Sequence, residues 1–368
     1  MITALLVADR LFAAREQAML SRIEVGIADE GVRVLHALPE DAQDLISGDA
    51  VARGITYRPR GPLPSLRVRA AAALEAALAQ PVFGEGARAR VDIVHAFGRD
   101  AWPISAEIAR QAEAPLVLEV WRAALVDRLT SISRVGRHGV PAVFTPDKSI
   151  ERVVTRASPG RLVRVVPWGV HCPREPRAHR NPDRACAIMI AGRGEDKYAI
   201  AECLAALGRL VETHNAMVFM DAEAGRRAGA AAIARQHGFL QRFSLAPDLE
   251  GRREPVLRGD VLLLPEALGE HRSIALDAMA AGMAVVALAD SYVSWLIDGR
   301  TCVLVKEPAS DLWAEAIAPL LASPEAAHAL GERAREFVRS ERRASVHVAS
   351  LLDGYEWLTS SQSLSIAP

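Results

Sequence analysis

Cysteine is scarce in this sequence. Its 368 residues include four cysteines, at positions 172, 186, 203 and 302, without a CxxC pair or the Cys/His spacing of a zinc site. Neither a disulfide framework nor a metal centre is predicted from this distribution. We therefore expect a protein of a reducing compartment, the cytoplasm.

The sequence also lacks a long apolar run and an excess of charge of one sign. No stretch approaches the roughly 18 apolar residues needed to span a bilayer. The opening segment MITALLVADR becomes charged at Asp9 and has no basic flank, so we interpret it as a strand rather than a signal peptide. The formal net charge of -1 disfavours nucleic acid as a partner.

Short apolar runs alternate with helical patterns along the rest of the chain, as in parallel sheets with crossover helices. A chain of this length suits two domains. The predicted strands are residues 2–9, 32–39, 91–97, 114–121, 141–146 and 162–169 in the first half, and 185–192, 216–223, 242–247, 261–265, 283–289 and 302–305 in the second. This pattern predicts an α/β protein with two Rossmann-like parallel-sheet domains facing across a cleft.

The proline-rich segment PWGVHCPREPRAHRNPDR separates the two halves, because four prolines and a glycine suppress regular structure. We place an N-terminal domain at residues 1–168 and a C-terminal domain at residues 169–345. A closing helix at residues 346–360, which could pack back on the N-terminal domain, and a tail at 361–368 follow. Ligands of open parallel sheets bind beyond the carboxyl ends of the strands, so unusual residues in those loops are candidates for function.

The stretch PEALGEHRSIALDAMAAG, residues 265–282, places a lone carboxylate in an apolar helix. Ser273 is the predicted N-cap and Gly282 the C-terminal residue of this helix, whose amino end would favour phosphate. A buried, ionised Asp277 needs hydrogen-bond donors, which ribose hydroxyls would supply. Alternatively, Asp277 faces a thin strip of solvent or pairs with an arginine from a neighbouring element.

The segment AGRGEDKYA, residues 191–199, follows a strand and opens a helix. Arg193 and Lys197 lie where the helix dipole disfavours cations unless an anion is present, so they indicate a diphosphate site. An ordinary charged surface turn is the alternative. Gly192 and Gly194 form a partial dinucleotide fingerprint with lysine in place of the last glycine, and a nicotinamide-dependent oxidoreductase is therefore a weaker hypothesis.

Two features of the first half are open to more than one interpretation. His95 ends a strand, where it could orient or polarise a substrate or serve as a satisfied core residue. Residues 121–138 combine four arginines with apolar side chains, which is typical either of a helix on an anionic membrane surface or of a solvated basic face. The first interpretation would add a peripheral location at the inner membrane face to the cytoplasmic one.

The order of these motifs resembles that of the retaining nucleotide-sugar glycosyltransferases of family four, which have the GT-B fold. The resemblance spans residues 1–358. It rests on Gly192-Arg193 with Asp196-Lys197, the strand from Asp260 to Pro265, the helix LDAMAAGMAVV, the turn IDGRTCVLV from Ile297, and the junction PWGVH.

The resemblance implies transfer of a hexose from a nucleoside-diphosphate sugar to an acceptor, with retention of configuration and without a metal or cofactor. It implies that Arg193 and Lys197 bind the donor diphosphate and that Asp277 binds the ribose. Glu270 would contact the sugar hydroxyls, and His95 the reacting hexose or the acceptor. The other residues implied in donor binding are Gly269, Ser273 and Ile274.

Departures from the family pattern support an alternative hypothesis. The first glutamate of the family's Glu-x7-Glu motif aligns with Gly269, beside Glu270, and the second is shortened to Asp277. The glycine-rich loop after the first strand is replaced by DRLFAAREQ, and Phe97 replaces the second histidine of an HAHG motif. These changes favour a protein that keeps the fold without transfer and acts as a nucleotide-binding or scaffold subunit. The sequence does not specify whether the acceptor is a sugar, a lipid or a protein.

Overall fold

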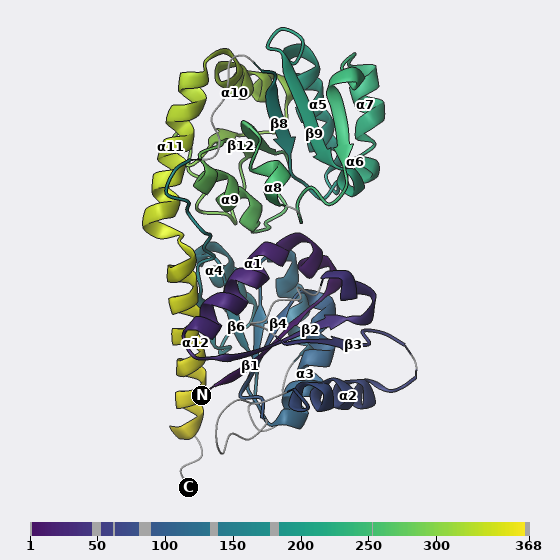
Figure 1. Ribbon diagram of the computed structural model, residues 1–368, viewed down its shortest axis with the longest axis vertical. Coiled ribbons are helices and arrows are strands. Elements are labelled where there is room, and N and C mark those ends of the chain that lie inside the picture. The colour runs from purple at the N-terminus through teal and green to yellow at the C-terminus, as the bar shows by residue number, and fades with distance from the viewer. Residues whose placement is uncertain are drawn as a thin grey trace. The chain divides into compact units, whose positions relative to one another are not determined.

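The computed structural model describes residues 2–45, 53–61, 63–80, 90–132, 139–176, 184–251 and 253–364. It divides into two compact units, one formed by Met1–Trp168 with Ala344–Pro368 and the other by Gly169–Arg343. Each unit contains a sheet whose strands all pair in parallel, with helices on both faces (Figure 1). The predicted α/β class with two parallel-sheet domains is therefore confirmed.

The first unit has a seven-stranded sheet in the order β3-β2-β1-β4-β5-β6-β7. Its strands are β1 Thr3–Ala8, β2 Arg33–Pro39, β3 Arg53–Tyr57, β4 Ile93–Phe97, β5 Leu116–Glu119, β6 Ala142–Thr145 and β7 Val163–Val165. Its helices are α1 Arg10–Asp29, η1 Glu40–Leu45, α2 Leu66–Leu78, η2 Arg99–Ala101, α3 Trp102–Ala112, η3 Ala123–Ser131, α4 Lys148–Ala157 and α12 Ala344–Leu364. Every residue of β1 and β4 is buried, as expected for central strands covered on both faces.

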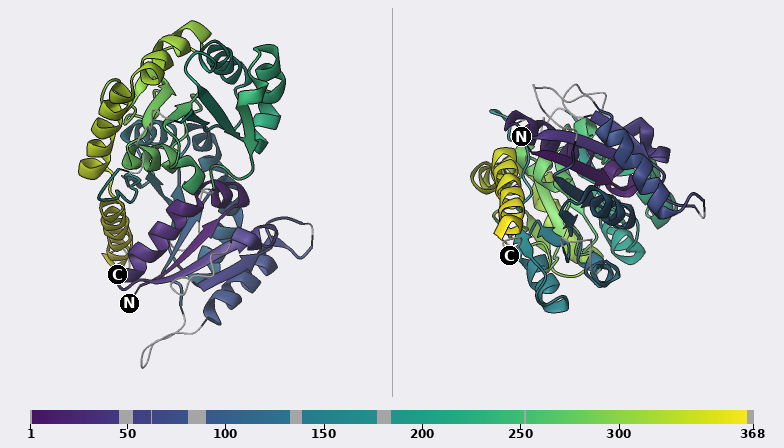
Figure 2. Two further views of the ribbon diagram at one scale, coloured as in Figure 1. Left: turned by 45° about the horizontal axis from the view of Figure 1, so that its top comes forward. Right: turned by 90° about the horizontal axis from the view of Figure 1, so that it is seen from below.

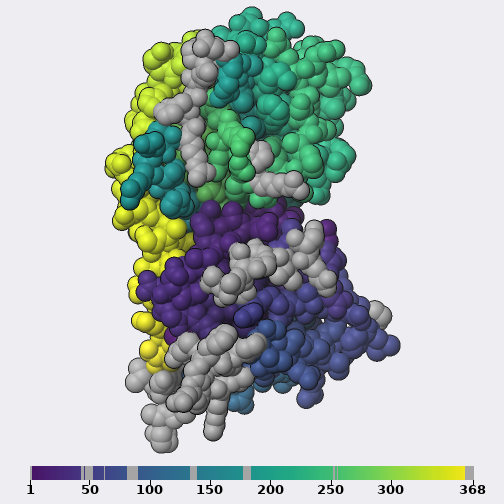
Figure 3. All heavy atoms as spheres, viewed as in Figure 1, coloured from purple at the N-terminus to yellow at the C-terminus, as the bar shows by residue number. Residues whose placement is uncertain are grey.

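Helix α12 belongs to the first unit, although it lies at the other end of the sequence. It packs along α1, and the two helices lie side by side in Figure 2 and in the space-filling view of Figure 3. A Cβ added to Gly26 of α1 would lie only 2.4 Å from Cγ2 of Val348, so the absence of a side chain permits this close packing. Tyr355 of α12 is fully buried, which makes the helix part of the core of this unit.

The second unit has a six-stranded sheet in the order β10-β9-β8-β11-β12-β13. Its strands are β8 Cys186–Ile190, β9 Ala216–Asp221, β10 Phe243–Ala246, β11 Val261–Leu264, β12 Ala284–Leu288 and β13 Val303–Val305. Its helices are α5 Lys197–Leu210, α6 Ala222–Ala228, α7 Ala230–Gln236, η5 Leu240–Arg242, α8 Arg253–Val256, α9 Ser273–Ala281, α10 Ser310–Ala322 and α11 Pro324–Glu341. Helix α10 packs on α5, and α11 packs on α9.

Local structure agrees with the sequence patterns except at two places. Each predicted strand is present, but β3 was not predicted because its first two residues, Arg53 and Gly54, are exposed at the sheet edge. Helix α9 is buried at all nine positions and ends at Gly282, whose φ of 85° is the left-handed conformation expected there. The N-cap of α9 is Arg272, and Ser273 is its first helical residue, so the prediction of Ser273 as N-cap is wrong.

Candidate functional site

The loops that follow β8 and β11 meet at a topological switch point in the second unit. From β8 the chain adds β9 and β10 on one side, and it then crosses to β11 on the other side of β8. Connections diverge at such a point, and open parallel sheets bind ligands there. The loop after β8 carries Arg193, and the loop after β11 carries Glu266 and Glu270.

Glu266 holds the loop between β8 and α5. Its carboxylate accepts hydrogen bonds from the backbone N–H groups of Gly194 (3.1 Å), Glu195 (2.7 Å) and Asp196 (2.8 Å), and from that of Arg193. Consecutive amides that converge at a helix amino end form an anion-binding nest. In this structure the anion is a side chain of the same protein, and the sequence analysis did not assign this residue a role.

Gly192 allows the Glu266 carboxylate to approach. A Cβ at this position would lie 2.5 Å from Oε2 of Glu266, and the Gly192 amide donates to Oε1 of Glu250 (2.9 Å). In a dinucleotide-binding turn, the glycine would instead admit a pyrophosphate. The space that a nicotinamide dinucleotide would need at this turn is therefore filled by Glu266, which disfavours the oxidoreductase hypothesis.

Arg193 lies inward and is held between two carboxylates. Its side chain is 10% exposed, with Nη1 3.2 Å from Oε2 of Glu270 and Nη2 2.8 Å from Oε1 of Glu195. The structure thus brings together Arg193 and Glu270, which the sequence analysis had placed in one site. Lys197 is the first residue of α5 and is exposed.

Asp277 is paired with an arginine, which was one of the alternatives for this carboxylate. Its Oδ2 lies 3.4 Å from Nε of Arg253 in α8, and both side chains are 8% exposed. Nη2 of Arg253 also donates to Oγ of Ser273 (2.9 Å), so one guanidinium links the first and second turns of α9. No sequence pattern pointed to Arg253, because nothing in the local sequence shows that α8 lies against α9.

Further carboxylates surround the amino end of α9. Arg272 forms an ion pair with Glu250, and Asp290, in the loop after β12, accepts from the amides of Gly269 (2.7 Å) and Tyr292 (2.9 Å). Burial raises the pKa of Asp290, and the nearby Glu270 carboxylate raises it further. Ile274, the second residue of α9, is buried.

A small pocket of about 30 Å³ lies among Glu266, Glu270, Arg272 and Asp290, with Trp295 on its apolar side. That volume holds about one water molecule. Within the second unit, the charged side chains at this edge are held by one another or by the backbone: Glu270, Asp277 and Glu250 pair with arginines, whereas Glu266 and Asp290 accept from backbone amides.

His95 lies in the core of the first unit and in the middle of β4, whereas the sequence analysis placed it at the end of a strand, where it could orient or polarise a substrate. It is fully buried, with Nδ1 2.9 Å from the Tyr355 hydroxyl and Nε2 3.2 Å from Oε2 of Glu119. Trp168 Nε1 donates to Oε1 of the same carboxylate (2.7 Å). Burial lowers the pKa of His95, although the bond to Glu119 opposes this. A neutral ring that donates from Nε2 and accepts at Nδ1 satisfies both partners, so the structure favours the core interpretation.

Residues 121–132 do not offer the apolar face that membrane contact would need. Residues 123–131 form the 3-10 helix η3. The large apolar side chains of the stretch are buried, namely Trp121, Leu125, Val126, Leu129 and Ile132. Residues 133–138, which include Arg134 and Arg137, lie outside the described residues.

Neither a membrane-spanning helix nor a metal-binding cluster is found among the residues that the structure describes. None of the helices in this part of the chain is both long enough and apolar enough to cross a membrane. Over the same residues, no group of three or more His, Cys, Asp or Glu side chains is arranged to hold a metal ion.

Known structures share this fold across nearly the whole chain. Sucrose-phosphate synthase from Thermosynechococcus elongatus superposes with a TM-score of 0.73 at 15% identity, over 98% of this chain and 100% of that one. Anabaena HepE in complex with UDP-glucose gives 0.72 at 12% identity, over 96% and 99%. WaaG, a glycosyltransferase involved in lipopolysaccharide biosynthesis, gives 0.63 at 16% identity, over 97% and 100%.

No protein family matches the sequence, and no curated protein matches it either. The superpositions nevertheless show that the chain has the two-domain GT-B fold of these glycosyltransferases. Identities of 16% or less show the fold alone.

Proposed function

We propose that this protein is a retaining glycosyltransferase that transfers a hexose from a nucleoside-diphosphate sugar to an acceptor. The fold is shared with glycosyltransferases, one of which, HepE, is known in complex with UDP-glucose. The observation that carries the proposal is the Arg193–Glu270 pair at the switch point of the second sheet. A cation and a carboxylate held at this edge suit a ligand that has both phosphates and sugar hydroxyls.

In this proposal Arg193 and Lys197 bind the donor diphosphate. A guanidinium has five N–H donors, so Arg193 can bind a phosphate oxygen while it keeps a carboxylate partner. Lys197 extends from the first turn of α5 into solvent, from where it can reach an anion. Stabilising the leaving diphosphate is the main electrostatic demand of a transfer that uses no metal.

The remaining donor contacts come from the loop after β11 and from α9. Glu270 accepts hydrogen bonds from the sugar hydroxyls, and the backbone at Gly269, Ser273 and Ile274 faces the donor. Asp277 binds the ribose, and Arg253 orients its carboxylate from the other side. A residue that fixes a ligand-binding carboxylate in this way reduces the entropy lost when the ligand binds.

A matched pair of arginine variants tests the donor site. Calorimetry with UDP, GDP and ADP is expected to show binding of one of them, and Arg193→Ala should weaken it about ten- to a hundredfold, because a hydrogen bond to a charged group contributes about 1.5–3 kcal/mol. Arg209→Ala is the control, since Arg209 lies near the other end of α5 and pairs with Asp311 at 2.7 Å. Absence of binding at millimolar nucleotide, or equal affinities of the two variants, would refute the proposal.

The second candidate function is a nucleotide-binding or scaffold subunit without transfer activity. Its support is that the arginines at this edge are already paired with carboxylates and that Glu266 fills the amide nest. Hydrolysis or transfer of a nucleotide sugar by the wild type, lost in Glu270→Gln, would favour the enzyme. Nucleotide binding without turnover in both proteins would favour the subunit.

A further inference from the structure

A pocket of about 450 Å³ lies in the first unit, at the carboxyl ends of strands β3, β4 and β5. This volume is within the range of small-molecule sites. Three arginines line it, each from a different loop: Arg60 after β3, Arg99 after β4 and Arg128 in η3 after β5. We call it the arginine pocket.

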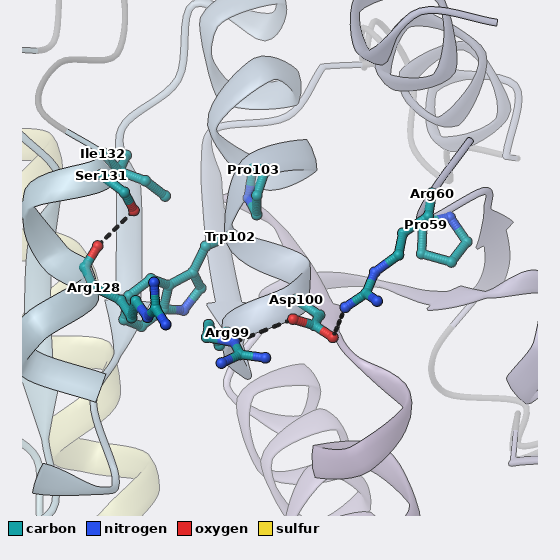
Figure 4. A pocket seen from close by; sticks show the side chains of 9 residues that line it. All are labelled: Pro59, Arg60, Arg99, Asp100, Trp102, Pro103, Arg128, Ser131 and Ile132. Carbon is teal, nitrogen blue, oxygen red and sulfur yellow. Dashed lines mark hydrogen bonds and ion pairs between the residues drawn. The ribbon is translucent and has the colours of Figure 1, made fainter. Parts of the chain in front are cut away.

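The lining of the arginine pocket has a net positive charge. Asp100 is its one acidic residue, so three guanidinium groups and one carboxylate leave a charge of +2. Asp100 forms an ion pair with Arg60 on one side and lies 3.2 Å from Nε of Arg99 on the other, as Figure 4 shows. It therefore orients two planar guanidinium groups beside the same space.

Arg128 is the cation of this pocket that has no carboxylate to balance it. Its side chain is exposed, and among the residues that the structure describes it makes no ion pair, while its carbonyl accepts from Oγ of Ser131 (2.6 Å). The apolar part of the pocket lining comes from Trp102, Pro59 and Pro103, which Figure 4 labels together with Arg128. A cluster of like charges without enough counter-charges costs free energy unless an anion binds among them.

The backbone beneath the arginines is fixed before any ligand binds. Asp9, directly after β1, accepts from the amide of Asp100 (3.0 Å) and caps α1 through the amide of Phe12 (2.8 Å). Gly98 has a φ of 88°, and a Cβ there would lie 2.2 Å from Oδ2 of Asp9. This geometry holds Arg99 and Asp100 at the switch point between β1 and β4, where parallel sheets bind ligands.

We propose that the arginine pocket binds a phosphate group. Guanidinium forks match phosphate oxygens in pairs, and the amino end of α3 at Trp102 adds a favourable dipole. If the protein is the transferase proposed above, the pocket recognises the acceptor, which is then a phosphate-bearing molecule. That phosphate belongs either to a free sugar phosphate or to the headgroup of an anionic lipid.

Calorimetry of the full chain with glucose 6-phosphate and with glucose tests whether the phosphate belongs to a free sugar phosphate. We expect binding of the phosphate ester but not of glucose, and weaker binding as the salt concentration rises. Arg128→Gln should raise Kd about three- to tenfold, and the triple change Arg60→Gln, Arg99→Gln and Arg128→Gln should abolish binding. Arg110→Gln is the charge-matched control, because Arg110 lies in the last turn of α3 and pairs with Glu107.

Cosedimentation with vesicles tests whether the phosphate belongs to the headgroup of an anionic lipid. Binding to phosphatidylglycerol vesicles but not to phosphatidylcholine, lost in Arg128→Gln and kept in Arg110→Gln, would assign the phosphate to a lipid headgroup. If neither glucose 6-phosphate nor the anionic vesicles bind, or if Arg128→Gln and Arg110→Gln behave alike, the pocket proposal is overturned. Because these titrations contain no nucleotide, their failure is distinct from a failure to bind UDP, GDP or ADP.

Discussion

At the scale of single residues, two glutamates of the two units are satisfied by partners distant in sequence. Glu119 accepts from His95 and Trp168, and Glu266 accepts from amides about 70 positions earlier in the chain. Sequence reasoning identified His95 from its predicted place at the end of a strand, although it lies in the middle of β4, and Arg193 from its place after β8. It could not identify Glu266 or Arg253, since their roles depend on which loops meet at the sheet edge.

His95 should make the stability of the first unit depend on pH. Burial lowers its pKa below the ordinary value of 6.5, so below that pH the unfolded chain binds a proton that the folded protein excludes. The contribution of His95 to stability is therefore complete above pH 6.5 and is lost as the pH falls, at up to about 1.4 kcal/mol per pH unit. Urea denaturation between pH 7 and pH 5 measures this slope.

The variant His95→Gln isolates that contribution. It should flatten the pH dependence between pH 6.5 and pH 5, whatever its effect on stability at pH 7. His171→Gln is the control, because this histidine is exposed and should leave the slope as it is in the wild type. A slope that is the same in His95→Gln and wild type would show that the ring is not held neutral.

Glu266→Gln should loosen the loop before α5. A glutamine amide keeps one acceptor oxygen but replaces the other with a donor, so the amides of Glu195 and Asp196, or those of Arg193 and Gly194, lose their partner. Losing hydrogen bonds to a charged acceptor costs about 1.5–3 kcal/mol, which predicts roughly ten- to a hundredfold faster amide exchange. Hydrogen exchange of a peptide covering residues 191–199 measures this increase in the exchange rate.

The matched control for this change is Glu254→Gln in α8. Glu254 carries the same charge, but its side chain is 75% exposed and pairs with Arg258, so exchange in residues 191–199 should not change. Equal exchange in both variants would mean that the four amides do not depend on the Glu266 carboxylate.

At the scale of elements, most of the fold could be predicted because buried parallel strands are continuous apolar runs. Strands such as VLLL and AVVAL in the second unit are buried at every position. The sequence did not indicate β3, since an edge strand pairs on one side only and tolerates the exposed Arg53 and Gly54. The N-cap was misplaced by one residue, since Arg272 has the extended backbone of the cap and Oγ of Ser273 accepts from Arg253.

The packing of α11 on α9 depends on Gly331. A Cβ at this position would lie 2.0 Å from the carbonyl oxygen of Gly282, and a backbone atom cannot move aside as a flexible side chain can. Gly331→Ala should therefore destabilise the protein by about 1–3 kcal/mol, although alanine is the better helix former by about 0.5–1 kcal/mol. Urea denaturation of the full chain measures this change in the free energy of unfolding.

The reverse substitution at an exposed position of the same helix separates the effect of helix propensity from that of the close contact with Gly282. Ala329 of α11 is exposed, so Ala329→Gly should cost only the difference in helix propensity, about 0.5–1 kcal/mol. A Gly331→Ala protein that is more stable than wild type would show that α11 can shift away from Gly282 at little cost.

At the scale of the whole molecule, the chain passes from one unit to the other twice, after Trp168 and after Arg343. The second unit is one continuous segment, whereas the first is completed by α12 from the end of the chain. The sequence analysis left the partner of this helix open, because its apolar residues alone do not show which core they enter.

Deleting residues 344–368 should therefore unfold the first unit and spare the second. Among residues 344–360, where burial is described, the deletion removes four buried apolar side chains, those of Val348, Leu351, Tyr355 and Leu358. At about 1.5–3 kcal/mol each, they contribute about 6–12 kcal/mol, as much as the whole stability of an ordinary domain. Limited proteolysis with mass spectrometry should show rapid cleavage within residues 1–168 and a resistant fragment near residues 169–343. Removing only residues 365–368 is the control and should leave both units resistant, whereas equal resistance of the two units after the longer deletion would mean that the first unit folds without α12.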